Sequence, residues 1–417
     1  MQARAARVWM AYQAATWFAF QTSATATAVF LITRLHLNAL ELTFVGTVLE
    51  VTVTLCEIPT GVVADTVSRK VSVVIGVALL GFGFLLYAVP SYPVILFAQV
   101  VWGVGYTFTS GADVAWITDE VGEEAARPLY VRGAQARQGA IFAGIIVGAA
   151  LGTIALWLAI VVGALVQLGN AIWLWFLMPE TAFVRADPAL RTSAATTMKR
   201  TVTDAVGTVR THPTLLITLG VMALMGLASE GFDRLWHLHI LNDIGVPHIG
   251  NFAPVVWTAA LEAGGLLCAI ALTELVRRRA DLESDRGVER TAEAVVLGMI
   301  IAVVVFGLSR SFWLATIALW AAAAVWEVSE PVVAAWVNRG LDPRTRATVN
   351  SLASQAEAVG QVGGGPTFGS IAVLTSTPTA LVCAGLVQLP SVVLLARRRR
   401  AAVRIDGTVP ADAAAVE

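Results

Sequence analysis

Charged residues are scarce in this chain. Of its 417 residues only 14% are Asp, Glu, Lys or Arg, whereas 57% are hydrophobic, and the mean hydropathy is +0.73. An ordinary soluble domain carries about 25% charged residues. A globular surface needs charge to remain in solution, so this deficit argues against a soluble protein. The composition predicts a chain that is embedded in the lipid bilayer.

Residue groups that serve enzymes and metal sites are also lacking. The cysteines Cys56, Cys268 and Cys383 lie in separate apolar runs and give neither a disulfide framework nor a metal-ligand spacing. His237 and His239 stand two residues apart, so on a helix they point to different sides. The sequence shows neither a nucleophile–base pair nor a glycine-rich phosphate loop. We therefore expect no enzyme, no metal or other cofactor, no ATP-driven step and no nucleic-acid partner.

Long apolar runs are abundant, and a transmembrane helix needs about 20 mostly apolar residues. In the first half such runs span 8–32, 41–64, 71–90, 93–118, 138–158 and 159–178. In the second half they span 214–240, 251–275, 293–309, 311–337, 348–373 and 376–396. The pattern predicts an all-α membrane protein of twelve transmembrane helices in two six-helix bundles, 1–178 and 214–396. A cytoplasmic central loop, 179–213, joins the bundles, and a cytoplasmic tail, 397–417, follows them.

Basic residues predict the orientation of the chain. With the N-terminus placed inside, only Arg34, Arg234 and Arg310 of the 28 Lys and Arg residues fall on the outer side or within a helix. Loops rich in Lys and Arg remain cytoplasmic. We therefore expect an even number of crossings and both termini in the cytoplasm. The expected location is a bacterial inner membrane, with the chain as a monomer.

A short pattern recurs in the two halves. Leu-Glu followed after four residues by Leu-Cys occurs at 49–56 and again at 261–268. A duplicated unit predicts two parallel repeats with a binding site between them. The pattern places Glu50 and Glu262 at matched positions, which favours them for proton coupling. The alternative is that each is a neutral carboxylic acid that hydrogen-bonds across helices.

The segment between the predicted helices 41–64 and 71–90 contains a motif, with Gly61 followed by Asp65 and then by the basic pair Arg69-Lys70. Gly61 allows a helix end to pack closely against a neighbour. Asp65 can accept hydrogen bonds from a helix N-terminus and can pair with Arg69. The segment resembles the cytoplasmic signature of the major facilitator superfamily of transporters. The spacing makes an ordinary charged turn the less favoured interpretation.

The resemblance implies that this motif latches the two halves in the outward-facing state. It implies that Asp65 meets the chain near Thr348, and that Arg69 reaches Asp119 or Glu120. The segments 57–61, 102–106 and 346–349 also look like the branch that contains tetracycline- and macrolide-efflux proton antiporters. That branch differs from this chain in the predicted helices 93–118 and 138–158, which lack its characteristic arginine and proline.

Acidic side chains lie inside the predicted helices, although a charge near the middle of the bilayer costs at least ~2.5–3.5 kcal/mol. They are Glu50, Glu57, Asp113, Glu230, Asp233, Glu262, Glu327, Glu330 and Glu357. The acidic excess indicates that several are protonated, or that they line a wet cavity receptive to cations or protons. We assign proton coupling to Glu50, Glu262, Asp113 and Glu357.

A substrate cavity is predicted from polar and aromatic residues at helical spacing. Trp102, Tyr106, Thr109 and Asp113 follow steps of four, three and four and so share one face of the predicted helix 93–118. Aromatic rings beside a carboxylate suit a bulky, apolar, often cationic ligand, although the same rings also suit packing between helices. The other assigned cavity residues are Gln13, Trp17, Gln21, Glu230, Arg234 and Glu330. Glu230 and Arg234, four residues apart, are expected to form a salt bridge.

Together these features predict a secondary transporter that exports amphipathic, drug-like small molecules by alternating access, with the proton gradient as its energy source. One alternative is a uniporter or symporter for a small metabolite. An alternative of another class is a membrane sensor or scaffold that has kept a transporter fold without transport.

Overall fold

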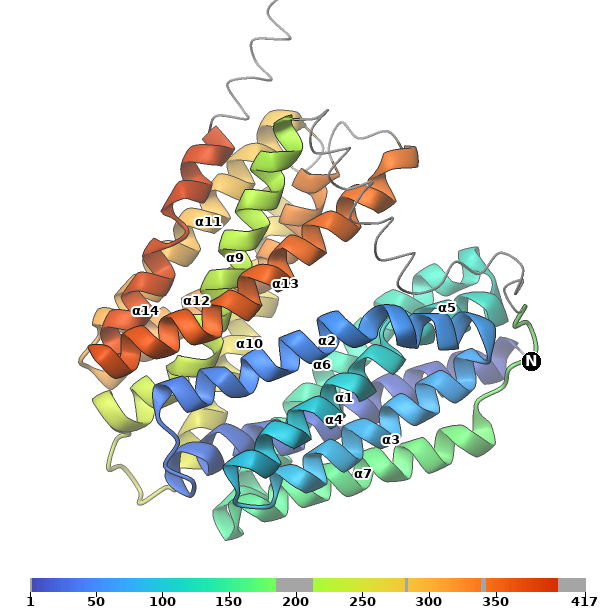
Figure 1. The fold of residues 1–417 in the computed structure, drawn as a ribbon, viewed down its shortest axis with the longest axis horizontal. Coiled ribbons are helices and arrows are strands. Elements are labelled where there is room, and N and C mark those ends of the chain that lie inside the picture. The colour runs from blue at the N-terminus through green and yellow to red at the C-terminus, as the bar shows by residue number, and fades with distance from the viewer. Residues whose placement is uncertain (1, 185–212, 282–283, 339–342, 397–417) are drawn as a thin grey trace, which may run out of the picture. The chain divides into compact units, whose positions relative to one another are not determined.

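The computed structural model describes residues 2–184, 213–281, 284–338 and 343–396, and within this part the chain is helical (Figure 1). The elements in chain order are α1 (Gln2–Thr33), α2 (Ala39–Thr66), α3 (Arg69–Tyr87), α4 (Tyr92–Thr109), α5 (Ala112–Val121), α6 (Glu123–Ile154), α7 (Leu156–Leu177), α9 (Pro213–Leu238), the π-helix η2 (His239–Ile244), α10 (Pro254–Arg279), α11 (Asp285–Leu308), α12 (Phe312–Val337), α13 (Pro343–Leu374) and α14 (Thr377–Leu386). Most of the predicted central loop and all of the predicted tail lie outside the described residues.

Eleven helical segments of the described part are long and apolar enough to cross a membrane. Three of them combine shorter elements: Tyr92–Val121, Leu215–Ile244 and Thr377–Ala396. A twelfth segment, α13, has 32 residues, and its polar and charged side chains keep it below the hydropathy of the others. The prediction of an all-α protein with twelve membrane-length helices is therefore confirmed.

The fourth predicted helix, 93–118, is wrong in one respect, because it is interrupted. α4 ends at Thr109 and α5 begins at Ala112, with Ser110 and Gly111 between them. Gly111 has φ +73°, a left-handed conformation that glycine adopts without the clash that a Cβ causes. Asp113 thus belongs to α5 and does not continue the helical face of α4.

The fifth predicted helix begins too late in the sequence. α6 starts at Glu123, whereas the apolar run that predicted it starts at residue 138. The segment 123–137 is rich in Glu, Ala, Arg and Gln, which favour helix without favouring lipid. Hydropathy therefore marked only the apolar part of a longer helix.

The chain divides into two compact units: Met1–Val202 with Gly245–Ala263, and Thr203–Ile244 with Gly264–Glu417. The start of α10 thus groups with α1–α7. In the first unit, Trp9 and Trp116 are buried in a core formed by α1, α3, α5 and α7. In the second unit, the buried core includes Val296 and Trp336. The boundaries predicted at 178 and 214 remain predictions.

Candidate functional site

A cavity of about 320 Å³ lies within the first unit. Its lining comes from α1, α3, α4, α5, α7 and the break between α4 and α5. Aromatic rings form much of its wall: Trp17, Phe20, Phe84, Trp102 and Tyr106. The rings of Trp102 and Tyr106 are stacked, with centroids 5.8 Å apart and planes 9° from parallel. This wall offers flat apolar surface to a ligand.

Asp113 supplies the negative charge of this first cavity. Its Oδ2 accepts hydrogen bonds from the Tyr12 hydroxyl at 3.3 Å and from Gln13 Nε2 at 3.4 Å. Its Oδ1 accepts the backbone N–H of Val114 at 2.6 Å. All three donors are neutral, so they orient the carboxylate without compensating its charge.

Six of the residues predicted to form a substrate or coupling site line this cavity together. They are Gln13, Trp17, Trp102, Tyr106, Thr109 and Asp113. The break at Gly111 changes the path of the chain, and Asp113 still faces the same space as Tyr106. Trp102, Tyr106, Thr109 and Asp113 were predicted to share one continuous helical face. That prediction was wrong about the helix, but the four residues do share a cavity.

The sequence did not predict the other lining residues of this cavity or a basic neighbour. Tyr12, Thr16 and Gln167 contribute polar groups to the wall. The Arg137 guanidinium lies over the Trp17 ring, 5.0 Å from its centroid. Tyr12 adjoins the predicted Gln13, so its position was the clearest available signal. Arg137 had been placed in a loop, because α6 was predicted to start after it.

Glu262 lies on the part of α10 that groups with the first unit. Its Oε2 accepts hydrogen bonds from Gln21 Nε2 and from Thr25 Oγ1, both at 3.0 Å. Gln21 was expected beside Gln13 and Trp17 in a substrate cavity. It is not among the residues that line the first cavity, and it donates a hydrogen bond to Glu262 instead. Glu50, the matched acid of the first repeat, is half-buried on α2 and is not among the residues that line the first cavity.

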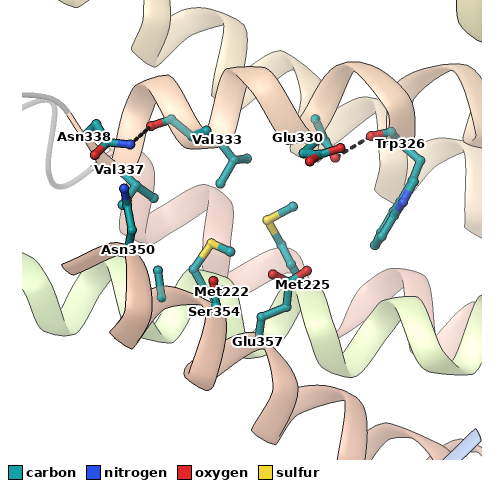
Figure 2. A pocket seen from close by; sticks show the side chains of 13 residues that line it. Met222, Met225, Trp326, Glu330, Val333, Val337, Asn338, Asn350, Ser354 and Glu357 are labelled. Carbon is teal, nitrogen blue, oxygen red and sulfur yellow. Dashed lines mark hydrogen bonds between the residues drawn. The ribbon is translucent and has the colours of Figure 1, made fainter. Parts of the chain in front are cut away.

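A second cavity, of about 380 Å³, lies within the second unit between α9, α12 and α13 (Figure 2). Glu330 from α12 and Glu357 from α13 both line it, together with Met222, Met225 and Trp326. The two acids were predicted for different roles, and the structure brings them to one space.

Glu230 and Arg234 were also predicted to face a cavity. Arg234 Nε lies 2.8 Å from Glu230 Oε1, as expected for residues four apart on a helix. The Glu230 side chain is buried, and neither residue is among those that line the second cavity. The observed contact fits a structural ion pair within α9.

Within the Gly61–Lys70 segment, Arg69 contacts an acid of α5. Arg69 Nη1 lies 2.5 Å from Asp119 Oδ2, and Arg69 Nη2 lies 4.0 Å from Asp65 Oδ1. The close packing expected at Gly61 is not present among the described residues, since an added Cβ would meet no heavy atom within 4 Å. The side chain of Thr348, the partner expected for Asp65, lies outside the described part.

Glu120 has a different role from the predicted pairing with Arg69. It accepts hydrogen bonds from the N–H groups of Thr181 and Ala182, at 2.5 and 2.9 Å, and from the Thr181 hydroxyl at 2.8 Å. Glu180 in turn accepts the Ser68 hydroxyl at 2.6 Å and the Lys70 N–H at 2.9 Å. These contacts fix the chain after α7 to the start of α3 and the end of α5, and a carboxylate at the start of α3 suits the helix dipole.

Most of the chain matches a known family in sequence. A sequence model of the Major Facilitator Superfamily matches residues 10–365. The chain belongs to the major facilitator superfamily. Within this superfamily, the "Uncharacterized MFS-type transporter YxaM" of Bacillus subtilis (strain 168) is 20% identical over 362 residues, which cover 85% of this chain and 86% of that protein.

Solved structures of major facilitator transporters share the fold. The nucleoside transporter NupG matches 95% of this chain and 98% of its own, with a TM-score of 0.70 at 12% identity. A bacterial homolog to the human lysosomal transporter Spinster, inward-facing and unoccupied, matches 95% of both chains, with a TM-score of 0.67 at 16% identity. As a member of the superfamily, this chain is a multi-pass membrane transporter of a small-molecule substrate and not an enzyme.

Proposed function

We propose that this transporter is a proton-coupled exporter of amphipathic small molecules and works by alternating access. The observation that carries the proposal is Asp113, a carboxylate at the edge of an aromatic cavity of about 320 Å³. Ligand pockets of this size combine apolar walls with a few placed polar groups. The rings of Trp102 and Tyr106 suit the apolar body of a substrate, and Asp113 suits its polar or cationic end.

The hydrogen bonds of Asp113 support a role in coupling. Its donors, from Tyr12, Gln13 and Val114, carry no charge. A charge inside the membrane needs compensation, which a proton or a cationic group of the substrate can supply. Competition between the two for one carboxylate would link substrate release to proton entry. Each charge that crosses 100 mV yields about 2.3 kcal/mol, which can drive export.

The direction of transport is supported by the resemblance of segments 57–61, 102–106 and 346–349 to the drug:proton antiporter branch. The proposal includes a monomer in a bacterial inner membrane with no bound cofactor. The structural relatives, one of which is a nucleoside transporter, indicate the fold alone.

Transport by inside-out membrane vesicles tests the proposal. A susceptibility screen of expressing cells first identifies an amphipathic substrate, and vesicles with an acidic interior should then accumulate it. We expect accumulation to stop when nigericin collapses the pH gradient. Asp113→Asn should reduce the rate at least tenfold, because loss of a charged hydrogen-bonding partner costs roughly 1.5–3 kcal/mol. The control, Glu124→Gln, removes an exposed acid at the start of α6 and should transport normally. Accumulation that continues without the gradient would refute proton coupling.

A further inference from the structure

The cavity between α9, α12 and α13 carries charge of one sign. Glu330 and Glu357 are its acids, and no arginine or lysine is among the described residues that line it. Figure 2 shows the two carboxylates extending from facing helices toward the same space. Met222 and Met225, both buried, and Trp326 add polarisable and aromatic surface. The cavity is therefore apolar on some walls and doubly acidic on others.

An unused acceptor adds to this character. Asn338 Nδ2 donates to the Ala334 carbonyl at 2.8 Å, and Figure 2 shows this bond at one end of the cavity. The Oδ1 of the same side chain is shielded from solvent and has no hydrogen-bond donor in the described part of the chain. A buried acceptor without a donor is costly, so a ligand that brings N–H groups would satisfy it.

The first cavity differs in its balance of charge. It contains one acid, Asp113, and a guanidinium, that of Arg137, already covers the ring of Trp17. In the second unit, Arg234 is held by Glu230 and does not line the cavity. The second cavity is thus the more strongly acidic of the two.

We propose that the second cavity binds an organic cation, an amine with an apolar body. The ammonium group would lie between Glu330 and Glu357, since it offers three donors to acceptors that carry the opposite charge. The apolar body would pack against Met222, Met225 and Trp326, which suit a cation-bearing ligand. A volume of about 380 Å³ is that of a small-molecule site. That the bound amine is also a transported substrate rests on the proposed function. Binding of the amine depends on the cavity alone.

Equilibrium binding to the full chain in lipid nanodiscs tests the inference. The probe is 4-phenylbutylamine, protonated at neutral pH, and its neutral counterpart is 4-phenylbutanol, with partition into empty nanodiscs subtracted. We expect the native chain to bind the amine at least tenfold more tightly than the alcohol, because charged hydrogen bonds exceed neutral ones in strength. Equal affinity for the two probes would overturn the inference without any variant.

Substitutions then locate the site. Glu330→Gln and Glu357→Gln should each weaken amine binding at least tenfold and leave alcohol binding unchanged. Glu327→Gln is the matched control, because Glu327 is exposed on the same helix and does not line the cavity. The unfolding midpoint of each variant shows whether it folds. If a Gln variant fails to fold, the corresponding Asp variant, Glu330→Asp or Glu357→Asp, takes its place. The Asp variants keep the charge and should therefore still bind the amine. Amine affinity that survives in either Gln variant overturns the two-carboxylate site.

The same measurements separate this inference from the proposed function. If the chain binds the amine but shows no gradient-driven export, the cation site is supported and the proposed export is refuted. If gradient-driven export continues after both glutamates are replaced, the proposed export is supported, and the cation site is refuted as part of the transport path.

Discussion

Acidic side chains in this chain are held in different ways. Glu230 and Asp119 lie against arginines, at 2.8 and 2.5 Å, and such pairs keep their charge by mutual compensation. Asp113 is oriented by neutral donors, and Glu330 and Glu357 share a cavity that no basic residue of the described chain lines. In the proposed function, acids of the second kind respond to a proton or a ligand, whereas acids of the first kind fix the fold.

Glu262 gives a prediction at this scale. Gln21 and Thr25 both donate to its Oε2, and an ionised carboxylate can only accept hydrogen bonds. A proton on that oxygen would turn it into a donor, so the contact with α1 must rearrange. We expect Glu262→Gln to lose gradient-driven export at least tenfold, while exchange of labelled for unlabelled substrate without a gradient continues. Equal loss of export and exchange would assign Glu262 to substrate binding or to the fold instead.

At the scale of elements, α9 and α13 approach each other through glycines. A Cβ placed on Gly226 would overlap the backbone carbonyl of Glu357, and one on Gly360 would overlap the carbonyl of Ala223. Small residues allow helix backbones to pack this closely within a membrane. The contact at Gly226 also sets the position of the backbone that carries Glu357, so helix packing and the second cavity are linked.

Replacement of Gly226 tests this packing. Gly226→Ala should destabilise the purified chain by roughly 1–3 kcal/mol, because an overpacked contact forces backbones apart. Gly169→Ala on α7 is the matched control, since its Cβ would meet no heavy atom of the described chain within 4 Å. Alanine there should be neutral or slightly stabilising. Unfolding midpoints in detergent measure both, and similar midpoints for the two variants would contradict a close contact at Gly226.

Elements also show the limit of sequence-based prediction for this chain. Hydropathy located the membrane-length helices because lipid requires apolar length, and it therefore missed the polar start of α6 at Glu123. It also missed the break at Gly111, because one glycine changes a backbone angle without changing hydropathy. Which acids share a cavity depends on contacts between helices, so Glu330 and Glu357 were identified as separate candidates and their common site was not predicted.

At the scale of the whole molecule, the helices divide into two compact units, and within the first unit the chain that leaves α7 is fixed to it. Glu120 and Glu180 accept the hydrogen bonds that hold this segment, and Thr181 and Ser68 are among the donors. Since Arg69 pairs with Asp119 at the same end, this end of the first unit is rich in charged contacts. The opposite loops, such as Leu35–Asn38, carry fewer charges. The cytoplasmic placement of this end, predicted from basic residues, remains a prediction.

Cysteine accessibility tests that orientation in full. In a chain whose three native cysteines are replaced, single cysteines at Asn251 and at Asp281 flank α10 on its two sides, and both positions are exposed. If both termini are cytoplasmic, a membrane-impermeant maleimide added to intact cells should label Asn251→Cys and not Asp281→Cys. In inside-out vesicles the labelling should be reversed. A third cysteine variant, Glu124→Cys at the start of α6, should follow Asp281→Cys, because an even number of crossings separates the two positions. Labelling of Glu124→Cys and Asp281→Cys from opposite sides would require an odd number of crossings between them and would refute the twelve-helix topology.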